Sequence, residues 1–241
     1  DAMGCVAVGG IVITEPALLV VTELTHGDVS CAGGNDGFSS VDVVGGTGPY
    51  NYLWELAGNP ISVNPGANNL VTGSYLVTIT DGNGCTDQIN VIINQPVALA
   101  AVATAFDADC AGANTGSAFV TVGAGTGTAP YTYQWSNGTL QQTDTAFNLT
   151  VNTVPGYTIT VTDSLGCTFV INNVVVDEPQ PLVLVPATIS STCGFANGTA
   201  SVTVGGGILP YSYNWTTTPA QGTAIASNVP AANYTVYVTD G

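Results

Sequence analysis

Cysteine is the residue of this chain whose spacing most clearly permits chemistry, because six cysteines recur at two fixed places in a repeated pattern. One set precedes a polar turn, and the other directly follows a glycine. The two sets are Cys31, Cys110 and Cys193, and Cys5, Cys85 and Cys167. Paired cysteines oxidise to disulfides, which persist outside the reducing cytoplasm. The regular placement therefore predicts disulfides in a secreted or cell-surface protein.

Residues capable of catalysis or metal binding are otherwise sparse. His26 is the single histidine, occurs in one copy of the pattern, and has no nucleophile of its own nearby, since Cys31 belongs to the repeated set. Acidic turn residues could offer oxygen ligands to Ca²⁺, but no complete calcium-loop spacing is present, and such residues also cap turns. These acids are Asp36, Asp81, Asp107, Asp109, Asp163 and Asp240. We predict no enzyme and no cofactor, with Ca²⁺ as the alternative.

The charge composition disfavours two classes of partner. The chain has 16 acidic residues and no Lys or Arg, which gives a formal net charge of −16. Nucleic acids and anionic lipids need basic side chains to neutralise phosphate, so neither is expected to bind. Hydrophobic residues make up 45% of the chain and charged residues 7%, which indicates a packed β core. The longest apolar run, 97–106, is too short for a membrane-spanning helix.

The cysteines belong to a motif that occurs three times. Each copy has a Pro-Tyr-x-Tyr-x-Trp segment and, after a stretch of variable length, a segment that opens on tyrosine and ends in Thr-Asp. The aromatic residues of the motif are Tyr52, Trp54 and Tyr75, then Tyr133, Trp135 and Tyr157, then Tyr213, Trp215 and Tyr234. Their alternation between glycine-rich turns favours core packing over a sugar-stacking platform.

Short alternating segments separated by turn residues define the predicted fold. In the second copy, strands are predicted at 97–106, 117–122, 131–135, 157–163 and 167–176, and no stretch has helical periodicity. Roughly seven short strands per copy are typical of an immunoglobulin-like sandwich, in which a tryptophan is buried on the third strand and a tyrosine marks a corner. We predict an all-β protein made of tandem Ig-like β-sandwich domains.

The repeat boundaries fall at Glu-Pro or Gln-Pro junctions. They define repeat 1 (residues 17–96), repeat 2 (97–179) and repeat 3 (180–241), with residues 1–16 resembling the end of a preceding repeat. Pro16 and Pro96 are 80 residues apart, and Pro96 and Pro179 are 83 apart, whereas only 62 residues separate Pro179 from Gly241. We therefore expect repeat 3 to lack its last strand.

The missing strand is expected to come from the N-terminal segment of the next copy. Its predicted inter-copy residues are Ala7, Val8, Ile11, Val12, Ile13 and Pro16. The copies could be separate subunits joined by strand addition, or windows of one long covalent array. In both cases the contact is head-to-tail and does not close, so it generates a fibre.

The motif resembles the repeats of the gliding-motility adhesin SprB and of related Bacteroidetes surface proteins. In the first copy it consists of Cys31, Gly45-Gly46, Pro49-Tyr50, Tyr52, Trp54, Tyr75, Asp81, Gly84-Cys85 and Pro96. The resemblance implies an extracellular location on a Gram-negative surface, export by the type IX system, and no catalysis. Asp144-Thr145-Ala146 and Asp163-Ser164-Leu165 also resemble the O-glycosylation signal of Bacteroidetes, which makes Thr145 and Ser164 candidate glycan sites.

Three disulfide frameworks fit the cysteine spacing. The within-repeat framework pairs Cys31 with Cys85, Cys110 with Cys167, and Cys193 with Cys5 of the next copy. In an Ig-like sandwich these positions lie at opposite ends of a strand about 23 Å long, whereas a disulfide requires Cα atoms about 6 Å apart. A rival framework joins neighbouring repeats through Cys31–Cys167 and Cys110–Cys5 of the next copy. The third framework is Cys5–Cys31, Cys85–Cys110 and Cys167–Cys193. We favour the within-repeat set because each repeat has a fixed number of cysteines.

The sequence as a whole predicts a structural extracellular filament or adhesin stalk, built by head-to-tail contacts between copies of the chain. The alternative is a carbohydrate- or surface-binding adhesin module that uses the variable loops at 55–70, 136–149 and 216–229. The three loops differ in sequence, which argues against one repeated ligand site.

Overall fold

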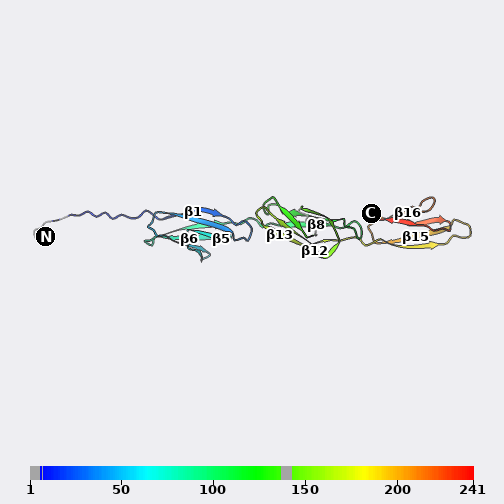
Figure 1. The fold of residues 1–241 in the computed structure, drawn as a ribbon, viewed down its shortest axis with the longest axis horizontal. Helices are drawn as coiled ribbons and strands as arrows, with labels where there is room; N and C mark the ends of the chain where they lie inside the picture. Colours follow the sequence, from blue (N-terminus) through cyan, green and yellow to red (C-terminus); the bar gives the residue numbers. More distant parts are fainter. Residues whose placement is uncertain (1–5, 7, 137–142) are drawn as a thin grey trace. The chain divides into compact units, whose positions relative to one another are not determined.

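The computed structural model describes residues 6, 8–136 and 143–241, and all of its regular secondary structure is β-strand (Figure 1). This part of the chain contains no helix that is long and apolar enough to cross a membrane. Each of the three repeats forms two antiparallel sheets. The prediction of an all-β protein with tandem Ig-like sandwiches is confirmed.

Repeat 1 has a three-stranded and a four-stranded sheet. The first has the order β1-β2-β5, and the second has the order β4-β3-β6-β7. The strands are β1 (Val20–Gly27), β2 (Gly37–Val44), β3 (Asn51–Leu56), β4 (Asn59–Ser62), β5 (Gly66–Leu70), β6 (Gly73–Thr80) and β7 (Thr86–Ile93). Side chains alternate between the two faces of a strand, so Tyr75, Val77 and Ile79 of β6 all point into the core and are at most 1% exposed.

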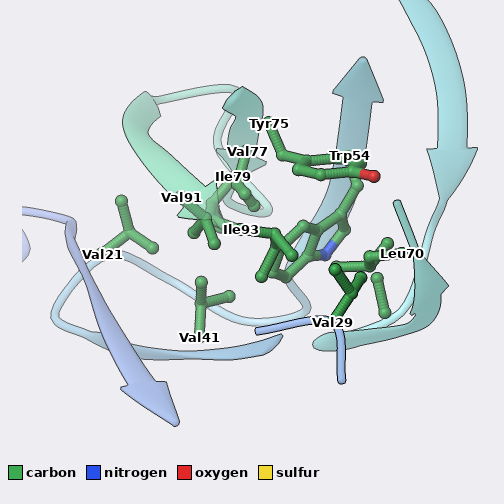
Figure 2. Close-up of a cluster of buried hydrophobic side chains, with 11 residues drawn as sticks. Val21, Val29, Val41, Trp54, Leu70, Tyr75, Val77, Ile79, Val91 and Ile93 are labelled. Atoms are coloured by element: carbon green, nitrogen blue, oxygen red, sulfur yellow. The ribbon is translucent and has the colours of Figure 1, made fainter. Parts of the chain in front are cut away.

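The core of repeat 1 lies between these two sheets (Figure 2). Trp54 on β3 is 0% exposed and packs with Leu70 of β5 and Ile93 of β7. Its indole Nε1 donates a hydrogen bond to the carbonyl of Asn64 at 2.9 Å. The single polar atom of a large apolar side chain is therefore satisfied inside the core.

Repeat 2 repeats this arrangement with sheets β8-β9-β11 and β10-β12-β13. The strands are β8 (Ala101–Phe106), β9 (Gly116–Val122), β10 (Thr132–Trp135), β11 (Thr145–Leu149), β12 (Asn152–Thr162) and β13 (Thr168–Val176). Trp135 is 2% exposed, and its Nε1 donates to the carbonyl of Thr143 at 3.1 Å.

Repeat 3 has the sheets β14-β15-β17 and β16-β18. The strands are β14 (Val183–Ile189), β15 (Gly198–Gly205), β16 (Ser212–Trp215), β17 (Ile225–Val229) and β18 (Val236–Thr239). Trp215 is 4% exposed, and its Nε1 donates to the carbonyl of Thr223 at 2.8 Å. The tryptophan environment is thus present three times.

A tyrosine on β6, on β12 and just before β18 makes the same kind of hydrogen bond in each repeat. The hydroxyl of Tyr75 donates to the carbonyl of Val71 at 2.9 Å, and that of Tyr234 donates to the carbonyl of Pro230 at 2.9 Å. In repeat 2, Tyr157 donates to the carbonyl of Thr150 at 3.0 Å. These contacts have the form of the tyrosine corner of Ig-like folds.

The contacts divide the chain into two compact units. The first contains residues up to Leu99 together with the loops 124–129 and 163–167. The second contains residues 100–123, 130–162 and 168–241. Two loops of repeat 2 therefore belong to the same unit as the sandwich of repeat 1.

Each stretch expected to be a variable loop contains a strand that the sequence reasoning missed. The strands β5, β11 and β17 lie inside 55–70, 136–149 and 216–229 and pair with β2, β9 and β15. The signal is a repeated Ala-x-Asn-Leu or Ala-x-Asn-Val sequence, in which the alanine and the last residue are buried. The asparagines Asn69, Asn148 and Asn228 have φ of 56°, 56° and 57°, a conformation that asparagine tolerates.

Candidate functional site

The candidate site is an open edge in the second sheet of repeat 3. In repeat 1, β6 lies between β3 and β7, and in repeat 2, β12 lies between β10 and β13. In repeat 3, β18 pairs with β16 along one edge, and no strand of the described chain pairs with its other edge. Such an edge presents backbone donors and acceptors that can template another strand.

The core of repeat 3 is exposed along this edge. Tyr75, Val77 and Ile79 are fully buried in repeat 1, whereas the corresponding Tyr234, Val236 and Val238 are only partly buried. Strand β14, at the edge of the other sheet of repeat 3, is exposed along its whole length. The apolar side chains that would be buried in the core of a complete sandwich are therefore accessible to solvent at the open edge.

A hollow of about 260 Å³ lies in the same region and includes Gly198 and Tyr234 in its lining. The matching glycines of the other repeats show what such a space normally holds. A Cβ placed on Gly37 would lie 2.8 Å from Cγ2 of Ile93, and one on Gly116 would lie 2.5 Å from Cγ1 of Val176. In repeats 1 and 2 an aliphatic side chain from the last strand therefore covers this glycine.

The N-terminal segment has exposed aliphatic side chains, which are the kind of side chain that covers the matching glycine in repeats 1 and 2. Val8, Ile11 and Ile13 are 93%, 90% and 94% exposed, and Val12 and Pro16 are exposed as well. Residues 8–19 form no strand (Figure 1). Ala7, another of the predicted inter-copy residues, lies outside the described residues. Four exposed aliphatic side chains within six residues of chain mark an interaction segment.

The structure contains a disulfide between Cys31 and Cys167, with Cα atoms 5.6 Å apart. The bond lies within the first compact unit and joins the turn after β1 to the loop between β12 and β13. The favoured within-repeat pairing, which used Cys31 with Cys85 and Cys110 with Cys167, is therefore wrong. It failed because a cysteine at one end of a strand cannot reach a cysteine at the other end.

The other three cysteines of the described chain, Cys85, Cys110 and Cys193, are free and exposed. Cys5 lies outside the described residues. The rival framework contained the observed bond, which joins a turn of repeat 1 to a loop of repeat 2.

A buried aspartate holds the turn of each of the two glycine–cysteine pairs that the structure describes, at Cys85 and Cys167. Oδ1 of Asp81 accepts from the backbone N–H groups of Asn83 and Cys85, at 2.9 and 2.8 Å, and Oδ2 accepts from Thr47 at 2.9 Å. Burial by itself would raise the pKa of Asp81, but these donors favour the charged form and lower the pKa below its ordinary value.

Asp163 holds the corresponding turn of repeat 2 in the same way. Its carboxylate accepts from the N–H groups of Leu165, Cys167 and Thr128 at 3.0, 2.9 and 3.0 Å. Here too burial by itself would raise the pKa of Asp163, but the hydrogen bonds outweigh this effect and lower the pKa. These two aspartates, whose sequence context also allows calcium binding, serve the backbone of a turn.

The remaining candidates do not converge on a site. Thr145 opens β11, and its hydroxyl donates to Oδ1 of Asp144 at 3.0 Å, whereas the hydroxyl of Ser164 donates to the carbonyl of Thr128 at 3.0 Å. His26 lies on β1 with Nδ1 3.3 Å from Oε1 of Glu23. Among the residues that the structure describes, no three His, Cys, Asp or Glu side chains gather closely enough to hold a metal ion.

The aromatic motif residues lie in the two-sheet cores, at different depths. The three tryptophans and Tyr75 are buried, whereas the other tyrosines of the motif are partly buried. The partly buried tyrosines are Tyr52, Tyr133, Tyr157, Tyr213 and Tyr234.

The family model for the SprB repeat matches the chain three times, over residues 25–59, 102–140 and 188–219. These three matches make the chain similar to proteins that contain SprB repeats. Each match includes the turn with its cysteine and the strand with its tryptophan. SprB repeats are found in cell-surface proteins, and the disulfide fits an extracellular protein, so both observations support a surface adhesin-type repeat protein.

Several solved structures are similar in fold to the chain. The three N-terminal domains of the bacteriophage RB49 highly immunogenic outer capsid protein are 14% identical, with 82% of this chain and 73% of that chain covered and a TM-score of 0.43. The eight N-terminal Ig domains of Down Syndrome Cell Adhesion Molecule isoform 1.30.30 are 16% identical, with coverage of 93% and 42% and a TM-score of 0.30.

A tetra-tandem repeat from the extending region of a large adhesion protein is also 16% identical, with coverage of 91% and 64% and a TM-score of 0.25. The chain therefore spans less than two thirds of this structure and less than half of the eight-domain structure of the cell adhesion molecule. No curated protein sequence matches the chain.

Proposed function

We propose that these repeats form an extracellular filament or adhesin stalk, in which the N-terminal segment of the next copy adds a strand to the open edge of repeat 3. The observation that supports this most directly is the match between residues 5–16 and the last strand of repeat 1. Cys5 precedes Pro16 by the same number of residues as Cys85 precedes Pro96, so the two segments align without a gap.

This alignment assigns a register to the added strand. In repeat 1, Val91 lies opposite Tyr75, and in repeat 2, Val174 lies opposite Tyr157. Ile11 of the next copy would therefore lie opposite Tyr234. Ile13 corresponds to Ile93 and would fill the hollow beside Gly198, which removes its apolar side chain from water.

The same register gives a hydrogen-bond acceptor to a backbone N–H group in the turn that follows β14. The N–H of Val29 donates to the carbonyl of Asn94 at 3.1 Å, and the N–H of Ala108 donates to the carbonyl of Asp177 at 2.9 Å. The corresponding pair in repeat 3 is the N–H of Ser191 and the carbonyl of Thr14 of the next copy. Main-chain hydrogen bonds would supply affinity, and the isoleucine positions would fix the register.

The contact leaves the N-terminal segment of one copy and the open edge of the other free for further copies. A heterologous contact of this kind adds units without closing, so the product is a fibre rather than a small oligomer. The net charge of −16 and the absence of basic residues keep neighbouring fibres apart through mutual repulsion.

The test compares the full chain with a variant that lacks residues 1–16, both kept reduced so that disulfides play no part. We expect filaments of the full chain in electron micrographs and no filaments of the shortened chain. A synthetic peptide of residues 6–16 should bind the shortened chain. Filaments of the shortened chain, or no binding of the peptide, would contradict the proposal.

The mass of the native polypeptide, after reduction and boiling in denaturant, distinguishes two forms of the same architecture. A mass of 24.2 kDa means separate subunits that donate strands to one another. A mass many times larger means a covalent tandem array, in which the added strand belongs to the same polypeptide.

A further inference from the structure

The observed disulfide joins two kinds of turn, and each kind occurs again in the chain with a free cysteine. Cys167 lies in the turn held by Asp163, and Cys85 lies in the equivalent turn held by Asp81. The N–H of the cysteine donates to Oδ1 of the aspartate at 2.9 Å in the first and 2.8 Å in the second. The aspartate N–H donates back to the cysteine carbonyl at 3.0 and 2.9 Å. Cys85 is thus presented in the same way as a cysteine that forms a disulfide.

Cys31, the other cysteine of the disulfide, also has an equivalent elsewhere in the chain, Cys110. The carbonyl of Cys31 accepts from the N–H of Gly34 at 2.8 Å, and that of Cys110 accepts from Ala113 at 3.0 Å. In both turns the second residue after the cysteine is a glycine in the left-handed region, with φ of 74° and 75°. Cys110 is therefore held in the same turn as Cys31 but has no partner in the described chain.

Cys193 occupies this position in repeat 3. It lies four residues after the end of β14, as Cys31 lies four residues after β1. The preceding N–H, that of Thr192, donates to Oδ1 of Asn197 at 2.8 Å, as the N–H of Ser30 donates to Oδ1 of Asp36 at 3.0 Å. The turn after Cys193 is one residue shorter than in repeats 1 and 2, but the cysteine is exposed.

The observed bond connects the turn after the first strand of one repeat, which carries Cys31, to the aspartate-held turn of the following repeat, which carries Cys167. Applied along a head-to-tail array, this rule assigns a partner to every free cysteine. Building on the filament proposed above, we propose that Cys193 of one copy bonds to Cys85 of the next copy, and that Cys110 bonds to Cys5 of the next copy. Two disulfides then cross each contact between copies.

The chemistry balances with a small disulfide, such as oxidised glutathione, as the oxidant. The thiolate of Cys85 attacks the oxidant, breaks its S–S bond and releases one small thiol. The thiolate of Cys193 then attacks this mixed disulfide, forms the Sγ–Sγ bond and releases the second small thiol. Two cysteine thiols lose two protons and two electrons, and one small disulfide gains them.

The order of events follows from effective concentration. Strand addition would hold the two cysteines of each pair beside one another, so that the second step becomes intramolecular. Docking therefore comes first and sets the pairing, and oxidation then makes the contact resistant to denaturants. A filament that is reversible under reduction would become covalent in an oxidising extracellular environment.

The experiment oxidises preassembled full chain with oxidised glutathione, blocks the remaining thiols with N-ethylmaleimide and separates the product on a non-reducing denaturing gel. We expect a ladder at multiples of 24.2 kDa that collapses to one band after reduction. The variant C85S/C110S removes one partner of each proposed bond and should give only the monomer band. The matched variant C31S/C167S loses the same number of cysteines and should keep the ladder.

Peptide mapping identifies the bonds, and it requires chymotrypsin because the chain has no Lys or Arg for trypsin. Linked peptides that contain Cys85 with Cys193, and Cys5 with Cys110, are the expected result. A ladder that persists in C85S/C110S, or linkages between other cysteines, would overturn the pairing.

Electron microscopy before oxidation separates this inference from the proposed function. Reduced chains that form filaments but give no ladder after oxidation overturn the disulfides and leave the filament in place. Chains that neither assemble nor crosslink overturn both.

Discussion

Asp81 and Asp163, which hold the turns of Cys85 and Cys167, should make the stability of their repeats depend on pH. The folded-state pKa of Asp81 lies below its ordinary value of 3.8, because backbone donors favour the charged form. Its contribution to the free energy of unfolding is therefore fully present above about pH 4, and it is lost as the pH falls through the folded pKa.

The variant Asp81→Asn tests this directly. An amide replaces one acceptor oxygen with a donor that faces a backbone N–H, so the free energy of unfolding should fall at pH 7. The deficit relative to wild type should shrink as the pH is lowered to 3, since protonation then weakens the wild-type turn as well. Urea unfolding at both pH values measures the difference. The exposed Asp42 supplies the control Asp42→Asn, and an equal effect of both variants would refute the assignment.

Trp54 should be among the residues whose loss destabilises repeat 1 most. It is 0% exposed and its indole is hydrogen bonded, so Trp54→Ala leaves a large cavity and an unsatisfied carbonyl at Asn64. We expect the free energy of unfolding to fall by about 3–5 kcal/mol. Denaturant unfolding checks this value, with Leu24→Ala as the control because Leu24 is 64% exposed on β1. Similar losses for the two variants would contradict the core role.

The added strand should tolerate changes at alternate positions only, because the side chains of a strand alternate between two faces. Ile13 corresponds to Ile93, which is 1% exposed, and Val12 corresponds to Ile92, which is 58% exposed. Ile13→Asp would bury a carboxylate in the hollow of repeat 3, whereas Val12→Asp would leave it in water.

We expect Ile13→Asp to raise the concentration needed for assembly by about a hundredfold or more, since each 1.4 kcal/mol is a factor of about ten. Val12→Asp should assemble nearly as well as wild type. Light scattering of reduced protein over a concentration series measures both. Equal inhibition by the two variants would rule out the proposed register.

Repeats 1 and 3 should differ in how their stability depends on protein concentration. Repeat 1 has its last strand within the chain, whereas repeat 3 has an edge strand with a partly exposed core. A copy that binds only the folded form of repeat 3 stabilises it by mass action. Hydrogen exchange in β16 and β18 should therefore slow as the concentration of reduced chain rises, while exchange in β3 and β6 stays constant. Equal behaviour of the two sheets would argue against strand addition.

Much of the fold could be read from alternation and turn residues because each strand carries its own pattern. The inward residues of β6 and the tryptophan strands were evident from period-two spacing. The strands β5, β11 and β17 were missed because they are short and interrupted by an asparagine in the left-handed region, which breaks that spacing. Only the threefold recurrence of Ala-x-Asn with a terminal aliphatic residue marks them.

The sequence by itself determined the repeat and the Ig-like class, because periodicity and composition are local properties. Only the tertiary structure decided which cysteines meet. The partners Cys31 and Cys167 are 136 residues apart, and no local pattern reports a distance between turns of different repeats. Tertiary structure also decided that Gly198 lines a hollow, since the space beside a glycine depends on whether a distant strand covers it.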